Sequence, residues 1–379
     1  MRSKSIPALA RASAAVLLLV IAGACTSGTL TPKEKLGKAL FFDQNLSLKS
    51  NQSCATCHAP DVGWTGPHAD INTHGTVYEG SIPGAFGDRK PPAAAYGGNC
   101  PILHYDTKEG VWVGGMFWDG RATGSALGDP LAEQAQGPFL NPKEQALSNP
   151  EAVISIVKAS TYAGLFTEQC PGSDTTDLYN CIGRAIAAYE RSSEVNPFTS
   201  KYDYWLKGKA KLAAEEHLGL ALFNGKAKCS ECHLSKGDKP LFTDFTYDNL
   251  GIPKNPENPA TIANPNWADP GLGGFLRSAG RDKRVYMAEW GKHKVPTLRN
   301  VDKRPSEGFV KAYGHNGYFK SLLEIVHFYN TRDLPGAGWP APEVADNVNT
   351  DEMGDLGLSP REEAAIVAFM KTLTDGWQP

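Results

Sequence analysis

The motif Cys-x-x-Cys-His occurs twice in this chain of 379 residues, which has eight cysteines. The copies lie at residues 54–58 (CATCH) and 229–233 (CSECH). A thioredoxin-type redox pair needs no histidine after its second cysteine, and a zinc site needs a second ligand pair nearby. Covalent haem uses all three residues, because two thiols form thioethers and the histidine binds the iron. The sequence therefore predicts two c-type haems, bound by Cys54, Cys57 and His58 and by Cys229, Cys232 and His233.

The same apolar pattern precedes both motifs. Residues 34–41 (EKLGKALF) and 216–223 (EHLGLALF) share the sequence E-x-L-G-x-A-L-F. Their apolar residues recur at i, i+3 and i+4, the spacing of a helix with one apolar face. A repeated unit of helix and haem motif predicts a mainly α fold with two cytochrome-c-like domains, at 25–205 and 206–379.

Other segments complete this expectation. Helices are predicted at 151–160 and 176–192, and a third after Ser359, a capping residue that is followed by proline. Residues 61–115 and 235–285 are rich in Gly, Pro, Asn and Asp, which predicts long irregular loops over the haems.

The first 24 residues have the composition of a secretory signal peptide. Basic residues precede an apolar run at 14–22, and Ala22-Gly23-Ala24 fits a small-residue cleavage site. The run is too short to span a bilayer. We therefore expect a signal peptide at 1–24 and a periplasmic protein. Cys25 would begin the mature chain, so a lipid anchor at Cys25 stays open.

The remaining cysteines and the charge balance give weaker indications. Cys170 and Cys181 bracket a turn-rich stretch, which favours either a local disulfide in an oxidising compartment or a buried free pair. Cys100 has no obvious partner. The totals of 38 Lys plus Arg and 41 Asp plus Glu give no basic field for nucleic acid.

Further segments resemble those of the bacterial di-haem cytochrome c peroxidase and MauG superfamily. Besides both haem motifs, these are FWDGRA at 117–122, EQAQGPFLNPKE at 133–144, KVPTLRNV at 294–301 and GHNG at 314–317. The resemblance covers essentially all of the chain after residue 24. It implies a peroxidase that reduces hydrogen peroxide with electrons from a protein donor.

The resemblance implies roles for individual residues. His58 would bind the iron of the peroxide-reactive haem, and Gln134 and Glu144 would overhang its open face, with Pro138 between them. Trp118 would lie between the haems and relay electrons. A carboxylate over the iron can move a proton between the peroxide oxygens, so the chemistry agrees. The alternatives are an exposed loop glutamate and a core tryptophan.

The sixth ligand of the second haem distinguishes two branches of the superfamily. Where the cytochrome c peroxidase branch has methionine, this chain has Tyr329, as MauG-like enzymes do. The resemblance thus implies that His233 and Tyr329 bind the second iron. An anionic oxygen ligand favours oxidised iron. The alternative is a packed Tyr329 with His327 or Met287 bound instead.

Further ligands follow from the resemblance. In the cytochrome c peroxidase branch, a histidine near the position of His74 can bind the first haem as sixth ligand. His68 is a second candidate, and a surface histidine is the alternative for both. Calcium between the domains stays open as a third cofactor, because its mainly backbone ligands need no particular side chain.

Three candidate propionate partners, with exposed ion pairs as the alternative, are Arg89, Arg121 and Arg299.

Three functions compete. The first is a MauG-like enzyme that uses peroxide to oxidise Trp or Tyr side chains of a partner protein. The second is a cytochrome c peroxidase that removes peroxide with electrons from a small cytochrome c or cupredoxin. The third is a non-catalytic di-haem electron carrier. Gln134 and Glu144 argue against the third, and Tyr329 favours the first over the second.

Overall fold

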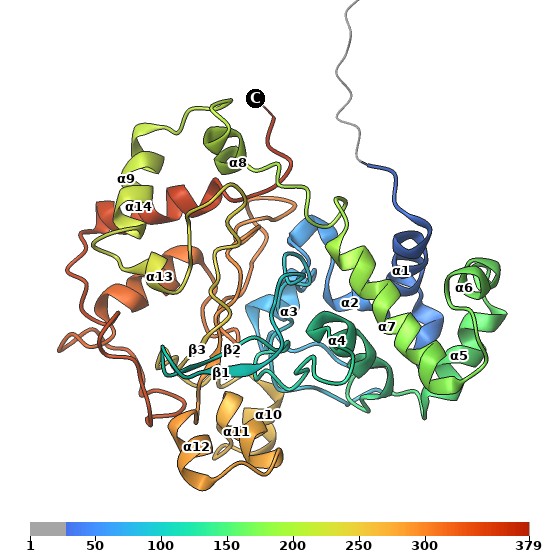
Figure 1. The fold of residues 1–379 in the computed structure, drawn as a ribbon. Coiled ribbons are helices and arrows are strands. Elements are labelled where there is room, and N and C mark those ends of the chain that lie inside the picture. The colour runs from blue at the N-terminus through green and yellow to red at the C-terminus, as the bar shows by residue number, and fades with distance from the viewer. Residues whose placement is uncertain (1–27, 379) are drawn as a thin grey trace, which may run out of the picture.

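The structure, a computed structural model, describes residues 28–378. The predicted signal peptide and Cys25 lie outside these residues. Within them the chain forms fourteen α-helices and four short strands, with long connections between them (Figure 1). The prediction of a mainly α fold is confirmed. No helix in the described part has the length and apolar character needed to cross a membrane.

The helices divide between the two halves of the chain. The N-terminal half contains α1 (Pro32–Phe42), α2 (Cys54–Cys57), α3 (Ala69–Thr73), α4 (Pro130–Leu140), α5 (Pro150–Ala159), α6 (Ala163–Gln169) and α7 (Thr175–Arg191). The C-terminal half contains α8 (Lys201–Leu206), α9 (Ala214–Phe223), α10 (Pro259–Ala263), α11 (Gly271–Ser278), α12 (Lys283–Ala288), α13 (Leu322–Thr331) and α14 (Pro360–Lys371). The helices predicted at 151–160 and 176–192 are α5 and α7.

The strands form two antiparallel pairs. β1 (His104–Asp106) pairs with β2 (Val111–Val113), and β3 (Tyr247–Asp248) pairs with β4 (His293–Lys294). The segments predicted as irregular loops therefore contain short elements. In 235–285 these include α10, which begins at a proline after a capping asparagine, and α11. A local cap can start a short helix such as α10 even in a segment rich in Gly and Pro.

Capping residues fix where the repeated helices begin. Thr31 and Glu34 form a reciprocal capping box at the start of α1, which has proline at its first position. Ser359 and Glu362 do the same for α14, as its sequence predicts. Each box satisfies backbone N–H groups that the first helical turn leaves without partners.

Each half is built on one close pair of crossing helices, α1 with α7 and α9 with α14 (Figure 1). A Cβ atom on Gly37 would lie 1.9 Å from the Ala185 oxygen, and one on Gly219 would lie 1.9 Å from the Ala365 oxygen. The two partner helices also match, with A-I-x-A-[YF] at 185–189 and 365–369. The internal repeat therefore includes a second helix that the motif comparison alone did not identify.

Two hydrophobic cores follow from these helix pairs. The first includes Leu36, Phe41 and Tyr189, and the second includes Phe223 and Phe369. Phe198 packs against the first core, whereas Tyr202 belongs to the second. We therefore propose a domain boundary near residue 200, a few residues before the expected one.

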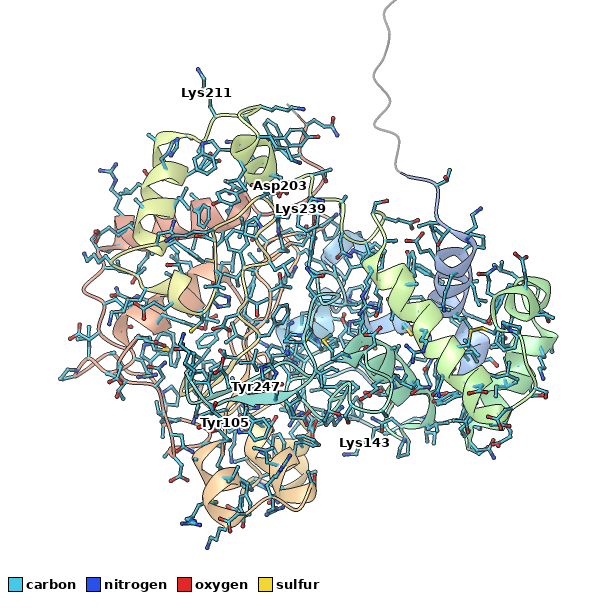
Figure 2. The ribbon with its side chains drawn as sticks, viewed as in Figure 1. Tyr105, Lys143, Asp203, Lys211, Lys239 and Tyr247 are labelled. Carbon is cyan, nitrogen blue, oxygen red and sulfur yellow. A yellow bond between two sulfur atoms is a disulfide. The ribbon has the colours of Figure 1, made fainter. Side chains whose placement is uncertain are left out.

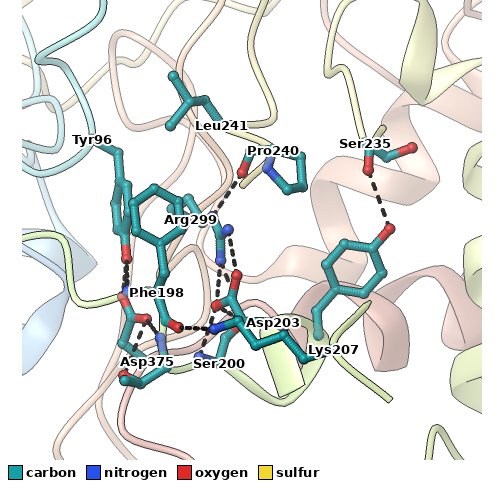
Figure 3. A network of polar contacts seen from close by, with 12 residues as sticks. Tyr96, Phe198, Ser200, Asp203, Lys207, Ser235, Pro240, Leu241, Arg299 and Asp375 are labelled. Carbon is teal, nitrogen blue, oxygen red and sulfur yellow. Dashed lines mark hydrogen bonds and ion pairs between the residues drawn. The ribbon is translucent and has the colours of Figure 1, made fainter. Parts of the chain in front are cut away.

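A buried polar network of the C-terminal half is joined to the N-terminal half through Tyr96. Both Nη atoms of Arg299 donate to the Asp203 carboxylate at 2.7 and 2.8 Å, and its Nε donates to the Pro240 carbonyl at 2.9 Å (Figure 3). Beside it, the Tyr96 hydroxyl donates to Asp375 at 2.7 Å. Burial is tolerated because every charge is paired and hydrogen-bonded.

The close helix crossing gives the first prediction. Gly37→Ala forces a methyl group into the α7 backbone, so we expect a loss of about 1–3 kcal/mol in the free energy of unfolding. Calorimetry of the holoprotein should show a lower thermal midpoint. Gly164→Ala is the matched control, because Gly164 is an exposed helical glycine with nothing within 4 Å of the added methyl. Equal midpoints in the two variants would contradict the packing argument.

Candidate active site

Each Cys-x-x-Cys-His motif lies in the wall of its own large cavity. The first cavity, with about 1610 Å³ of empty space, is lined by Cys54, Cys57 and His58. The second, with about 1670 Å³, is lined by Cys229, Cys232 and His233. Part of both volumes is open to solvent.

The motif histidines have the surroundings of iron ligands. The Nδ1 atom of His58 lies 3.3 Å from the Trp64 carbonyl, and that of His233 lies 2.8 Å from the Phe242 carbonyl. A hydrogen bond from Nδ1–H leaves Nε2 free for a metal. Burial lowers the pKa of His58 to about 4 and also lowers that of His233, so both rings are neutral at neutral pH. Both sites fit a haem iron.

The motif cysteines do not form disulfides in this structure. Burial raises the pKa of all four thiols: Cys54, Cys57, Cys229 and Cys232. A thioredoxin-type cysteine has the opposite property, a lowered pKa and an accessible thiolate. Buried thiols at the edge of a cavity suit covalent attachment instead.

Trp118 lines both cavities. Its indole Nε1 donates to the Lys90 carbonyl at 2.8 Å, and its own carbonyl accepts from the Lys294 backbone N–H at 2.9 Å. The side chain is buried and its orientation is fixed by the indole hydrogen bond. The structure thus places this tryptophan between the two sites, where the resemblance implies a relay.

Gln134, Pro138 and Glu144 all line the first cavity. The first two lie on α4, and Glu144 follows in the turn after that helix, where its N–H donates to the Asn141 carbonyl at 3.0 Å. The Glu144 Oε2 atom is buried and has no hydrogen-bond partner among the described residues. Burial raises the pKa of Glu144, with Arg121 opposing. An unpartnered buried carboxyl oxygen is costly, which indicates that something else binds there.

Glu190 is a second buried carboxyl at the first cavity, which sequence reasoning missed. Its Oε2 atom also lacks a partner among the described residues, and burial raises its pKa to about 8. In the internal repeat it corresponds to Met370, which lines the second cavity. Comparison of the two helices α7 and α14 is the signal that could have identified it.

Tyr329 on α13 lines the second cavity, and burial raises the pKa of its hydroxyl. His327 and Met287 do not line that cavity. The His327 side chain is 52% exposed and pairs with Glu363 at 2.9 Å. Of the three candidates for the sixth ligand, the structure brings only Tyr329 to the site.

The structure does not bring His74 to the first cavity. Its side chain is 69% exposed and its Nδ1 lies 3.4 Å from Glu257. His68 does not line that cavity either, and its ring lies beside the Tyr78 ring. His74 is therefore a surface histidine in this structure, as the alternative interpretation proposed. The segment after the first motif places it away from the cavity.

Each of the three arginines that were candidates for binding haem propionates pairs with a carboxylate of the protein. Arg89 pairs with both Asp119 and Asp269 at 2.6 Å, and Arg121 pairs with Asp119 at 3.0 Å. Arg299 is bound to Asp203 as described above. Arg89 and Arg121 line the first cavity and Arg299 lines the second.

The cysteines outside the motifs are also placed. Cys170 and Cys181 form a disulfide with an S–S distance of 2.03 Å, so the disulfide alternative is confirmed (Figure 2). Cys100 is buried, and its Sγ lies 3.1 Å from the Lys294 Nζ.

Comparison with known proteins identifies the family of this chain. The sequence profile of the family described as "Di-haem cytochrome c peroxidase" matches residues 31–211. The methylamine utilization protein MauG of Paracoccus denitrificans is 34% identical over 95% of this chain and 94% of that protein. The cytochrome c551 peroxidase of Nitrosomonas europaea is 30% identical over 91% of this chain and 80% of that protein.

Solved structures give the same result. The diheme peroxidase BthA from Burkholderia thailandensis superposes with a TM-score of 0.78 at 30% identity, covering 91% of this chain and 86% of that chain. Together, the two similar cavities, the matching sequence profile and the full-length relatives show that this chain belongs to the di-haem cytochrome c peroxidase family that includes MauG.

Proposed function

We propose that this di-haem peroxidase is a MauG-like enzyme of the periplasm that uses hydrogen peroxide to oxidise a Trp or Tyr side chain of a partner protein. The observation that carries the proposal is Tyr329 at the second cavity, in the place where a donor-fed cytochrome c peroxidase has methionine.

Lipid attachment at Cys25 would be tested by mass spectrometry of the mature protein.

In this proposal the first haem is attached to Cys54 and Cys57 with His58 as its ligand, and the second to Cys229 and Cys232 with His233 and Tyr329. When bound there, haem would supply iron that binds and reduces peroxide. All other steps fall to the side chains of the chain itself.

Glu144 moves the proton in the proposed reaction. Its free, buried Oε2 can take a proton from one peroxide oxygen and return it to the other, and a raised pKa favours such exchange near neutral pH. Gln134 offers an amide that can hydrogen-bond peroxide, and Pro138 offers no side-chain donor. Trp118, shared by both cavities, relays electrons between them.

Tyr329 sets the direction of electron flow. Phenolate oxygen stabilises oxidised iron, whereas a thioether stabilises reduced iron, so the second site would have a low potential. A low-potential site is a poor acceptor for electrons from an ordinary small cytochrome. It suits an enzyme that first reacts with peroxide and then withdraws electrons from a protein side chain.

The second candidate is a peroxide-removing cytochrome c peroxidase fed by a small cytochrome c or cupredoxin. The similarity to a protein named as a cytochrome c551 peroxidase favours it. A non-catalytic electron carrier is less well supported, because it gives no reason for a buried Glu144 oxygen in the first cavity that lacks a partner among the described residues.

Glu144→Gln tests the proton transfer. Glutamine keeps the shape but cannot exchange the proton, so the reaction with peroxide should slow by about 10²–10⁴-fold while both haem spectra persist. Stopped-flow absorbance measures the rate. In the matched variant Glu190→Gln, the other buried carboxyl is replaced and the slowing should be less than about tenfold. Normal turnover in Glu144→Gln would overturn the role.

Glu190 gives a prediction for pH dependence. Its pKa is raised by burial to about 8 in the folded state, so its contribution to stability is complete below the unfolded pKa and is lost as pH rises through about 8. Glu190→Gln should therefore gain thermal stability relative to wild type as pH rises from about 5 to about 8. Melting curves of both holoproteins measure this difference. The exposed-residue control Glu168→Gln should track wild type, and a constant offset for Glu190→Gln would contradict the burial of its carboxyl.

Tyr329→Phe tests the proposed function itself. It should change the visible and electron-resonance signals of one haem only, because phenylalanine cannot bind iron. Tyr313→Phe is the control, since Tyr313 lines the same cavity but its hydroxyl donates to the Val301 carbonyl at 3.3 Å.

The same two variants separate the candidate functions. When peroxide is added to the oxidised wild-type protein and to Tyr313→Phe, we expect a new near-infrared band and slow oxidation of reduced cytochrome c. Tyr329→Phe should lose the band. Unchanged spectra in Tyr329→Phe, or rapid cytochrome c oxidation by wild type without the band, would reject the MauG-like proposal.

A further inference from the structure

The segment at residues 62–76 connects the first haem motif to the rest of the molecule. It carries Trp64, whose carbonyl faces the Nδ1 of His58 at 3.3 Å. Trp64 has φ of +62°, in the left-handed region that is uncommon for residues other than glycine. Such a backbone persists only where its surroundings hold it. What holds this segment therefore decides how the His58 ring is oriented.

Lys311, from the C-terminal half, holds the beginning of the segment. Its Nζ donates to the carbonyls of Val62 at 2.8 Å, Asn300 at 2.8 Å and Lys303 at 3.1 Å. The residue is 5% exposed, and no carboxylate among the described residues lies within ion-pair distance. Burial lowers the pKa of Lys311, but three carbonyl acceptors require three N–H groups, which only the charged ammonium has. The charge is thus balanced by main-chain dipoles.

Lys320 holds the end of the segment in the same way. Its Nζ donates to the carbonyls of Asn72 at 2.9 Å, His74 at 2.8 Å and Gly317 at 2.8 Å. Two of these carbonyls belong to the segment and the third to the C-terminal half. Because Lys320 binds the His74 carbonyl, it also holds the His74 side chain at the surface, outside the first cavity.

The part of the segment between the attachment points of Lys311 and Lys320 is also closely packed against the C-terminal half. The Asn72 Nδ2 donates to the carbonyls of Gly66 at 3.0 Å and Val310 at 3.1 Å. A Cβ atom on Gly63 would lie 2.8 Å from the Asn300 oxygen. The segment therefore has little freedom to shift while both ammonium groups are in place.

We propose that Lys311 and Lys320 are positioning residues for the first haem. Their ammonium groups act as internal cations that clamp the segment at residues 62–76 onto the C-terminal half and so fix the carbonyl that orients His58. The inference rests on the proposed role of His58 as iron ligand. It means that the half of the molecule that carries the second site also sets the geometry of the first.

The test uses the holoproteins Lys311→Met and Lys320→Met, with Lys211→Met as the control. Lys211 is exposed at the edge of the molecule, far from the segment (Figure 2). Methionine keeps a long apolar side chain and removes the charge. Hydrogen exchange measures protection of the segment, and resonance Raman measures the iron–histidine vibration of each haem.

We expect faster exchange at residues 62–76 in both lysine variants and a shifted iron–histidine band for the first haem only, with the larger change in Lys311→Met. The control should match wild type. Unchanged exchange and an unchanged first-haem band would overturn the proposal, as would equal changes at both haems. If Lys311→Met does not fold, Lys320→Met decides by the same criteria. A wild-type protein without an iron–histidine band at the first haem would instead refute the assignment of His58.

Discussion

The close crossing of two helices in each half is the constraint on which the sites depend. Gly37 and Gly219 let α1 and α9 lie directly against the backbones of α7 and α14, since any side chain there would collide with a carbonyl. Each first helix is followed by a haem motif: α1 ends at Phe42 before Cys54, and α9 ends at Phe223 before Cys229. Each crossing thus forms one wall of a cavity and brings the two cysteines and the histidine to that wall.

The shared wall shows how one repeated unit gives two different sites. Phe41 and Ile186 line the first cavity at the repeat positions where Phe223 and Ile366 line the second. The chemistry differs in what surrounds this common frame. The first cavity has the buried carboxyls of Glu144 and Glu190, which can bind and move protons. The second has Met370 at the position of Glu190, and Tyr329, the proposed oxygen ligand.

The connection between the halves has an apolar part, in which Trp112 packs with Tyr247 and Leu272, and a polar part. In the polar part, the Tyr96 hydroxyl and the ammonium groups of Lys311 and Lys320 are buried or half-buried and are bound by a carboxylate or by carbonyls. Such contacts are directional, because each requires defined donors and acceptors. They fix the relative placement of the two cavities, and Trp118 lies where both cavities meet.

The features that could be predicted from the sequence are those made by residues close together in the chain. Haem attachment needs residues adjacent in the chain, so the motifs are readable directly, and so are the capped helix starts at Thr31 and Ser359. The exposed position of His74 depends on contacts far apart in the sequence, which no local pattern encodes, whereas Glu190 is found only when α7 is compared with its repeat α14. Lys311 meets the carbonyl of Val62 across 249 positions. The short helix α10 was missed because its capping asparagine and first-turn proline outweigh a Gly- and Pro-rich composition.

Tyr329 is proposed to make the second site a low-potential site, and anaerobic spectroelectrochemical titration of the holoprotein measures this property. We expect one haem to be reduced only well below the potential of an ordinary small cytochrome c, and its potential to rise in Tyr329→Phe. Ready reduction of both haems by reduced cytochrome c, or the same low potential in Tyr329→Phe, would contradict the proposal.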